Sequence, residues 1–271
     1  MNTPRVPVFI QAEELAALRS SPKLAIADLS AAPSYAMEHI PGAVHIPAAR
    51  LSMARPPVMG LLPPEEEIAE VLGEAGITPD SYVIAYDAES GLNASRFLWT
   101  LDLIGHTRFS MLDGGLRAWV NAGQETTSDE PDIVATEYRA HFRDEHRADK
   151  AWITAHLGNP DMTVLDSRTA AEYHGTDRRA ARGGHIPGAI NIDWSLALRG
   201  GGDLRLRASD ELRALFMNAG IRPEHEIVTH CHTHLRSSHA YLVLKMLGYP
   251  RLRGYPGSWS DWGNDPNTAI E

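Results

Sequence analysis

The chain has 271 residues, of which 43% are hydrophobic and 22% charged, as in ordinary globular proteins. Its formal net charge of −10 leaves no broad basic surface, which argues against nucleic acid or an anionic membrane as a partner. The single cysteine excludes an internal disulfide framework, and no apolar run approaches the roughly 20 residues of a membrane span. Because the segment MNTPRVPVFI lacks the features of a secretory leader, we expect a cytoplasmic protein.

The first half alternates short apolar runs with amphipathic ones. LAIAD, ending at Asp28, predicts a buried strand, and the turn sequence HIPGA follows at 39–43. PPEEEIAEVLGEAG (63–76) predicts a helix, because proline opens it, acids fill its first turn and glycine closes it. The pattern continues with a strand over 82–87 and a helix over 95–105.

The second half repeats this order. HIPGA recurs at 185–189 after an apolar run ending at Asp166, and later runs predict a helix over 208–220, a strand over 226–231 and a helix over 238–248. A tyrosine precedes each HIPGA, and from Gly105 and Gly248 onward the two halves match at a constant offset of 143 residues. These matches indicate a duplicated domain.

The duplication predicts a domain at 6–123, a polar linker at 124–137 and a second domain at 138–267. Strand–helix alternation at this spacing predicts the α/β class, with a parallel sheet flanked by helices in each domain. In such sheets ligands bind at the carboxyl ends of the strands.

Cys231 lies at such an end, in the sequence EIVTHCHTHLRSSH. The loop from Cys231 to Arg236 precedes a predicted helix capped by Ser237 or Ser238, whose buried face is Ala240, Val243, Leu244 and Leu247. Backbone N–H groups at a helix N-terminus, together with the charge of Arg236, favour a thiolate and would stabilise an anionic sulfur bound to it. The first half has Asp87 opposite Cys231, which suggests a scaffold without chemistry of its own.

Two other interpretations of the cysteine compete with this one. A lone cysteine is often a small buried hydrophobic residue. His230, His232, His234 and His239 surround Cys231 and suggest zinc, but one short turn would have to supply every ligand, so we expect no metal site and no cofactor.

Several further residues are given roles by their positions. HIPGA reads as a structural turn held by His39 or His185, and the aspartates that end the two apolar runs are expected to organise backbone N–H groups. The spacing of Arg168 and Glu172 suggests an ion pair. Trp194 is a candidate wall of the pocket, and Arg182, in an arginine-rich insert of the second half, is a candidate for attracting anions.

The two HIPGA motifs, the pair DGGLRAW and YPGSWSDWG, and the turn CHTHLRS resemble the rhodanese family in its tandem form, over nearly the whole chain. This resemblance implies two rhodanese-like domains, of which only the second is catalytic. It also implies a sulfurtransferase in which Cys231 takes the outer sulfur of thiosulfate as a persulfide, releases sulfite and passes the sulfur to a thiophile such as cyanide. The loop residues expected to bind the anionic donor are His232, Thr233, His234, Leu235, Arg236 and Ser237.

Three alternatives accompany this hypothesis. Relatives specific for 3-mercaptopyruvate lack the charged end of the loop, so Arg236 favours thiosulfate as the donor. A sulfur carrier would instead deliver its persulfide to a partner protein. Phosphatases and arsenate reductases use the same loop logic, but the phosphatase loop has five residues between cysteine and arginine, whereas this one has four and fits a smaller group.

Overall fold

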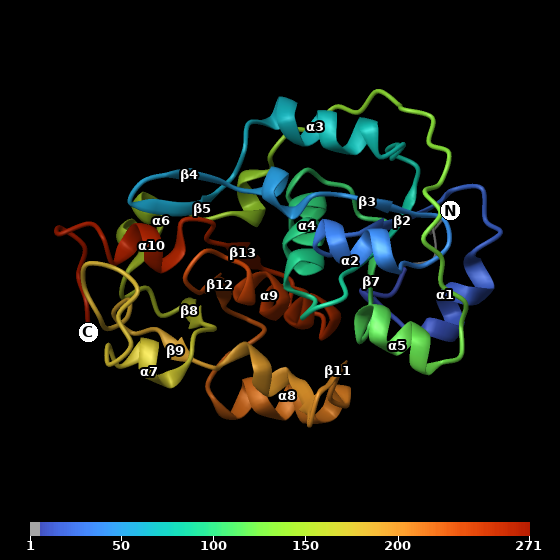
Figure 1. Ribbon diagram of the computed structural model, residues 1–271. Helices are drawn as coiled ribbons and strands as arrows, with labels where there is room; N and C mark the ends of the chain where they lie inside the picture. Colours follow the sequence, from blue (N-terminus) through green and yellow to red (C-terminus); the bar gives the residue numbers. More distant parts are fainter. Residues whose placement is uncertain (1–5) are drawn as a thin grey trace. The chain divides into compact units, whose positions relative to one another are not determined.

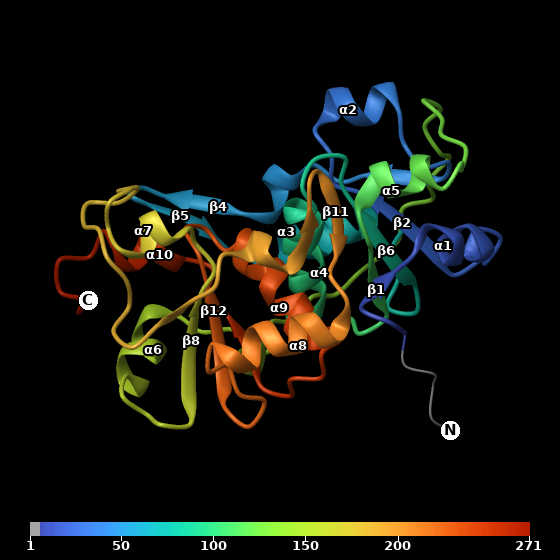
Figure 2. The same cartoon turned by 90° about the horizontal axis from the view of Figure 1, so that it is seen from below.

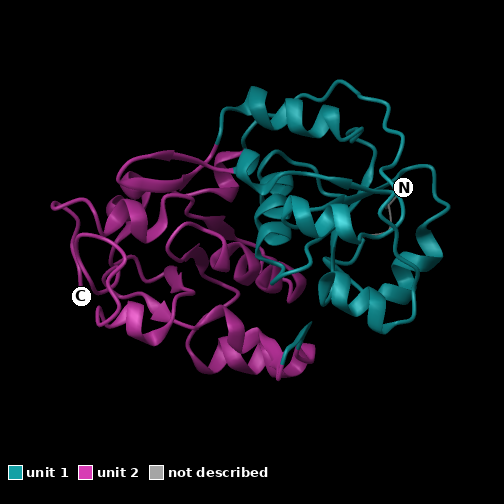
Figure 3. Cartoon of the chain, in the orientation of Figure 1, with its two compact units in different colours: residues 1–51, 63–142, 202–206 teal, residues 52–62, 143–201, 207–271 magenta. Residues whose placement is uncertain are grey.

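The computed structural model describes residues 6–271, which form two compact units (Figure 3). Unit 1 contains the described residues up to Leu51 together with residues 63–142 and 202–206. Unit 2 contains residues 52–62, 143–201 and 207–271. Each unit therefore includes one short segment from the other sequence repeat.

The sheet of unit 1 is parallel throughout, with five strands in the order β1-β7-β6-β2-β3. These strands are β1 (Phe9–Ile10), β2 (Leu24–Asp28), β3 (Ala43–His45), β6 (Tyr82–Tyr86) and β7 (Phe109–Leu112). Asp28 pairs with Tyr86 at the carboxyl edge, so the loop that starts with Asp87 leaves the sheet beside it. β11 (Asp203–Leu206) also belongs to this unit.

Five α-helices and one 3-10 helix accompany this sheet (Figure 1). They are α1 (Ala12–Leu18), α2 (Ala32–Met37), η1 (Ala48–Leu51), α3 (Glu65–Glu74), α4 (Leu92–Leu103) and α5 (Gly115–Asn121). α4 packs on β6 and β7, and its residues from Ala94 to Leu103 are all buried. The helix predicted over 63–76 is confirmed, with shorter bounds.

The sheet of unit 2 has four parallel strands in the order β13-β12-β8-β9. They are β8 (Met162–Asp166), β9 (Ile190–Asn191), β12 (Glu226–His230) and β13 (Leu252–Gly254). Asp166 pairs with His230, in the same register as the corresponding strand pair of unit 1. The two parallel sheets confirm the predicted α/β class.

The helices of unit 2 are η2 (Asp144–His146), α6 (Lys150–His156), α7 (Ala170–Tyr173), η3 (Trp194–Ala197), α8 (Ser209–Asn218), α9 (Arg236–Met246) and α10 (Ser258–Trp262). α9 packs on β12 and β13, and Figure 2 shows α9 next to β12. The predicted face of Ala240, Val243, Leu244 and Leu247 is buried. β10 (Leu198–Gly200) follows η3 directly.

The two HIPGA turns are built alike. The ring of His39 stacks on Tyr35 with 3.9 Å between centroids, and His185 stacks on Tyr173 at 3.7 Å. Each tyrosine hydroxyl donates to the carbonyl of the alanine that ends its motif, at 2.9 Å in the first repeat and 2.7 Å in the second. The structural role predicted for this motif is confirmed.

A two-stranded antiparallel hairpin from the first repeat belongs to unit 2. It consists of β4 (Met53–Arg55) and β5 (Val58–Leu61), and β5 packs against α10. The helix that receives the hairpin also borders Cys231.

Candidate functional site

Cys231 lies where β12 ends and α9 is about to begin, and it is 1% exposed. Its backbone N–H donates to the hydroxyl of Ser258 at 3.2 Å, and its carbonyl accepts from the N–H of Trp259 at 3.0 Å. Ser258 is the first residue of α10. The start of this helix therefore holds the backbone N–H and the carbonyl of Cys231.

The loop after Cys231 closes through a left-handed residue. His234 has a φ of 58°, a region that favours glycine, and its Nδ1 lies 2.7 Å from the hydroxyl of Ser237. α9 begins at Arg236, and its N-cap residue, Leu235, makes no side-chain cap. The predicted N-cap at Ser237 or Ser238 is therefore wrong, because Ser237 contacts the His234 ring instead. The hydroxyl of Ser238 donates to the carbonyl of Leu235 at 2.7 Å.

Arg236 is anchored by a buried carboxylate. Its two terminal nitrogens donate to the two carboxylate oxygens of Glu172 at 2.5 and 2.8 Å. Burial alone would raise the pKa of Glu172, but the hydrogen bonds and charge of Arg236 outweigh it and lower the pKa to about 2. Burial likewise opposes the charge of Arg236, and its bonds to Glu172 and Cys231 more than compensate and raise its pKa.

The ion pair between Arg168 and Glu172 suggested by their spacing does not form. Arg168 instead pairs with Asp166 at 2.6 Å, and both side chains are almost completely buried. The guanidinium lies over the ring of Trp259, 4.3 Å from its centroid. Asp166 also accepts from the backbone N–H of Arg168 at 3.0 Å, which confirms its predicted role of organising the backbone.

Two histidines beside the loop are buried and neutral at pH 7. His230 lies 3.5 Å from a carboxylate oxygen of Asp166, and its Nδ1 lies 3.2 Å from the carbonyl oxygen of Cys231. Burial lowers the pKa of His230 to about 4, and Asp166 only partly opposes this effect. Burial also lowers the pKa of His239 to about 4.

His232 and Thr233 are half-buried. The carbonyl of His232 accepts from the backbone N–H of Ser260 at 3.0 Å, and Thr233 lies against Gly60 of the hairpin. Burial lowers the pKa of His232, and the charge of Glu172 opposes the shift. These contacts place both residues between α10 and the hairpin.

The two candidate pocket residues lie in different surroundings. Trp194 opens η3 and meets the edge of His239, with 5.4 Å between ring centroids, so it packs next to α9. The guanidinium of Arg182 donates to the carbonyls of Trp262 at 3.2 Å and Thr268 at 2.9 Å. Arg182 thus ties the insert to the C-terminal segment, and its side-chain hydrogen bonds do not reach the cysteine loop, the segment from Cys231 to Arg236.

The corresponding loop of the first repeat has a carboxylate where the second has sulfur. One oxygen of Asp87 accepts from the backbone N–H groups of Glu89, Ser90 and Gly91, at 3.1, 2.9 and 2.6 Å. The other oxygen accepts from Asn93 and Ala94 at 3.1 and 3.2 Å. A strand-to-helix loop of this kind therefore presents a set of N–H donors suited to an anion.

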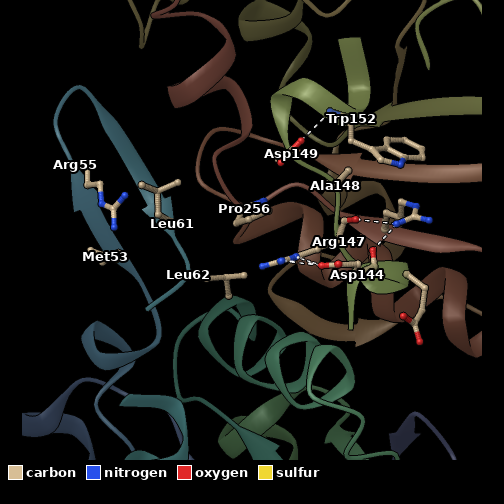
Figure 4. Close-up of a pocket in the computed structure, with 12 residues that line it drawn as sticks. Met53, Arg55, Leu61, Leu62, Asp144, Arg147, Ala148, Asp149, Trp152 and Pro256 are labelled. Atoms are coloured by element: carbon tan, nitrogen blue, oxygen red, sulfur yellow. Dashed lines mark hydrogen bonds and ion pairs between the residues drawn. The ribbon is translucent and has the colours of Figure 1, made fainter. Parts of the chain in front are cut away.

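A cavity of about 680 Å³ in unit 2 is separate from the loop that follows Cys231 (Figure 4). Its walls are the hairpin on one side and η2 and α6 on the other, and the lining residues are Met53, Arg55, Leu61, Leu62, Asp144, Glu145, Arg147, Ala148, Asp149, Trp152, Arg253 and Pro256. No residue from 231 to 237 contributes to it.

Residues 6–271 contain no group of three or more histidine, cysteine or acidic side chains placed to hold a metal ion. Within the same range no helix is long and apolar enough to cross a bilayer.

Two site residues were missed by the sequence reasoning. Glu172 carries no signal for its pairing with Arg236, because 64 residues separate them. Ser258 did carry a sequence signal, because the offset of 143 aligns this serine with a glycine, Gly115, in the first repeat. Both residues have a positive φ, 49° for Ser258 and 59° for Gly115, and a serine in a glycine conformation marks a position where the side chain is needed.

The fold and site define a class: two-repeat α/β proteins with one cysteine at a strand-to-helix turn of the second repeat. A model of the rhodanese-like domain matches residues 11–122 and again 149–265. The chain therefore belongs to the rhodanese family, with two rhodanese-like domains.

Individual relatives agree with this assignment. The chain is 41% identical to a thiosulfate sulfurtransferase of Pseudomonas aeruginosa, over 98% of this chain and 97% of the relative. It is 34% identical to the sulfur carrier protein TtuD of Thermus thermophilus, over 85% and 84% of the two chains. The crystal structure of SseA from Escherichia coli, named as a 3-mercaptopyruvate sulfotransferase, superposes with a TM-score of 0.84 at 28% identity, covering 94% of this chain and 99% of SseA.

Proposed function

We propose that this protein is a thiosulfate sulfurtransferase that carries sulfur on Cys231. The observation that carries the proposal is the pair of equivalent loops. In the first repeat five backbone N–H groups surround the carboxylate of Asp87, and the second repeat puts a cysteine at that position. Backbone N–H groups arranged in this way would stabilise an anionic sulfur, and a thiol is nucleophilic in its anionic form.

The reaction needs no redox partner. The Cys231 thiolate attacks the outer sulfur of thiosulfate, a new S–S bond forms, and the S–S bond of thiosulfate breaks as sulfite leaves with the electron pair. Cyanide or another thiophile then attacks the outer sulfur of the persulfide. Thiocyanate forms with cyanide, the persulfide S–S bond breaks, and the pair of electrons returns to Cys231 as a thiolate.

Arg236 supplies the positive charge for the anionic donor. It stands at the first position of α9, where the helix dipole adds partial positive charge, and Glu172 fixes its orientation. The remaining loop residues, from His232 to Ser237, are proposed to contribute backbone N–H groups to the bound sulfur. The high identity to the Pseudomonas thiosulfate sulfurtransferase supports this choice of donor.

Two variants of the function remain as candidates, each favoured by one relative. Likeness to SseA favours 3-mercaptopyruvate as the donor, and likeness to TtuD favours delivery of the sulfur to a protein acceptor. A cytoplasmic location, in keeping with the single cysteine, is part of the proposal.

Intact-mass measurements of the protein distinguish these candidate functions. Incubation with thiosulfate is expected to add one sulfur atom to the protein, and cyanide is expected to remove it as thiocyanate. Cys231→Ser should abolish both steps, and turnover by this variant would sink the mechanism. Faster loading from 3-mercaptopyruvate would reassign the donor, whereas loading without thiocyanate turnover would support a carrier. Arg236→Ala should raise KM for thiosulfate.

A further inference from the structure

The β4–β5 hairpin lies at the cysteine loop, although it comes from the first sequence repeat. Two of its consecutive residues, Met59 and Gly60, contact the loop or the helix that holds it. Both belong to unit 2 together with Cys231. These contacts suggest a role beyond covering apolar surface.

Met59 is connected to the loop through Ser260. The backbone N–H of Met59 donates to the Ser260 hydroxyl at 2.9 Å, and that hydroxyl lies 2.8 Å from the carbonyl oxygen of Met59. The backbone N–H of Ser260 in turn donates to the carbonyl of His232, the residue after Cys231. Ser260 of α10 thus hydrogen-bonds the hairpin through its side chain and the loop through its backbone.

Gly60 touches the loop directly. A Cβ atom on Gly60 would lie 2.6 Å from the carbonyl oxygen of Thr233, 2.8 Å from its Cβ and 2.9 Å from its Cα. These separations are well below van der Waals contact, and two of the three atoms are backbone, so a larger residue must displace the loop. The φ of Gly60, +75°, also favours glycine.

The rest of the hairpin is held less closely. Three other residues of the hairpin, Met53, Arg55 and Leu61, line the cavity of about 680 Å³ (Figure 4). The seat on α10 and Thr233 is therefore a local, specific contact at the middle of β5.

We propose that Met59 and Gly60 position the cysteine loop for sulfur transfer, with Gly60 as the positioning residue. This inference rests on the proposed sulfurtransferase function. The hairpin fixes the Thr233 peptide from one side while α10 fixes the His232 carbonyl from the other. The loop N–H groups and Arg236 are thereby kept in register with the sulfur. A shift of a few tenths of an ångström to an ångström in such donors costs up to about 100-fold in rate.

Gly42 provides a matched control. Its φ of +84° is close to that of Gly60, but a Cβ there would meet nothing within 4 Å. Gly60→Ala and Gly42→Ala therefore share the backbone strain, and only Gly60→Ala presses on the loop. Both should lower the melting temperature, whereas only Gly60→Ala should lower kcat for thiosulfate and cyanide, by about 10-fold or more.

Rates are normalised to the sulfur loaded per molecule, determined by intact mass, so that a smaller folded fraction does not imitate a slower site. KM should change less than kcat, because the substitution displaces the loop but leaves the charge of Arg236 in place. If both variants turn over within twofold of the wild type per loaded site, the hairpin has no positioning role. A wild-type protein that neither loads sulfur nor forms thiocyanate would instead refute the proposed function.

A second pair of variants covers the case in which Gly60→Ala does not fold. Ser260→Ala removes the grip on Met59 but retains the backbone bond to His232. Thr154→Ala, on α6, is its control, because it deletes a hydroxyl bonded to a backbone carbonyl at 2.8 Å on the exposed side of the helix. Ser260→Ala is expected to lower kcat at least threefold per loaded site and Thr154→Ala to leave it unchanged. Equal rates for the two would overturn the inference.

Discussion

Arg236 and Glu172 form a two-bond ion pair across 64 residues of sequence, with the Glu172 side chain 1% and the Arg236 side chain 15% exposed. The cation expected to attract the donor is therefore already bound to an anion. Glu172 both orients the guanidinium and offsets part of its charge, and the exposed Arg179 lies 3.6 Å from one oxygen of the same carboxylate.

Glu172→Gln is expected to lower kcat/KM for thiosulfate by about 10-fold, because a neutral amide cannot hold both nitrogens of Arg236. The free energy of unfolding should fall by about 3 kcal/mol, since a partly buried charge loses its partner. Steady-state kinetics and urea denaturation measure the two effects. Glu211→Gln, in the exposed pair with Arg207, is the control and should change neither. Unchanged kinetics in Glu172→Gln would show that Arg236 needs no anchor.

Two substitutions separate the effect of the Ser258 hydroxyl from that of the positive φ at this residue. Ser258→Gly removes the hydroxyl that accepts from Cys231 but relieves the positive φ, so stability should stay within about 1 kcal/mol. Ser258→Ala keeps the strain and loses the same bond, so it should be less stable than the glycine variant by about 1 kcal/mol. Both should reduce the rate of sulfur loading in stopped-flow experiments. Equal loading rates in all three proteins would mean that the hydroxyl serves only the fold.

Asp87→Ala should destabilise the protein by about 3 kcal/mol, because five backbone N–H groups lose their shared acceptor. Thiocyanate formation per loaded site should not change. Asp80→Ala is the matched control, because the Asp80 side chain is 83% exposed and its ion pair with Lys23 has a separation of 3.6 Å. The free energy of unfolding of this variant should stay within about 0.5 kcal/mol of the wild type. A drop in the rate per loaded site would give the first repeat a part in the chemistry.

Stability should decline in two acidic ranges. His230 and His239 have folded pKa values lowered from 6.5 to about 4, so the unfolded chain takes up their protons first and stability is lost as the pH falls from 6.5 towards 4. The pKa of Glu172 is lowered from 4.5 to about 2, which adds a loss between those values. His239→Gln should reduce the slope of the free energy of unfolding against pH in the first range by up to about 1.4 kcal/mol per pH unit. Urea denaturation at a series of pH values tests this, and an unchanged slope would contradict it.

The sequence predicted the features that depend on pattern or on short range. Duplication showed in the repeated HIPGA motifs and the constant offset, and the helices over 63–76 and 208–220 showed in their composition. The position of Cys231 between a strand and a helix followed from the same patterns.

Contacts between distant segments left no such trace. Arg168 was matched to Glu172 by helical spacing, yet it turns back to Asp166 two residues away, because that buried carboxylate needs a cation. The start of α9 was misplaced by two residues because His234 adopts a left-handed conformation that its residue type does not announce. The packing of the hairpin on α10 depends on Ser260 and Gly60, and no periodicity or motif in the sequence predicts that these two distant segments meet.

The hairpin also limits how the protein can be divided. A gene fragment encoding only residues 138–267 would contain Cys231, Arg236 and Glu172, but it would lack residues 52–62, which complete the same compact unit. The Ser260 hydroxyl would lose Met59, and the Thr233 side of the loop would face solvent. The first repeat therefore cannot be removed without loss, because the compact unit that holds Cys231 includes residues 52–62 of it.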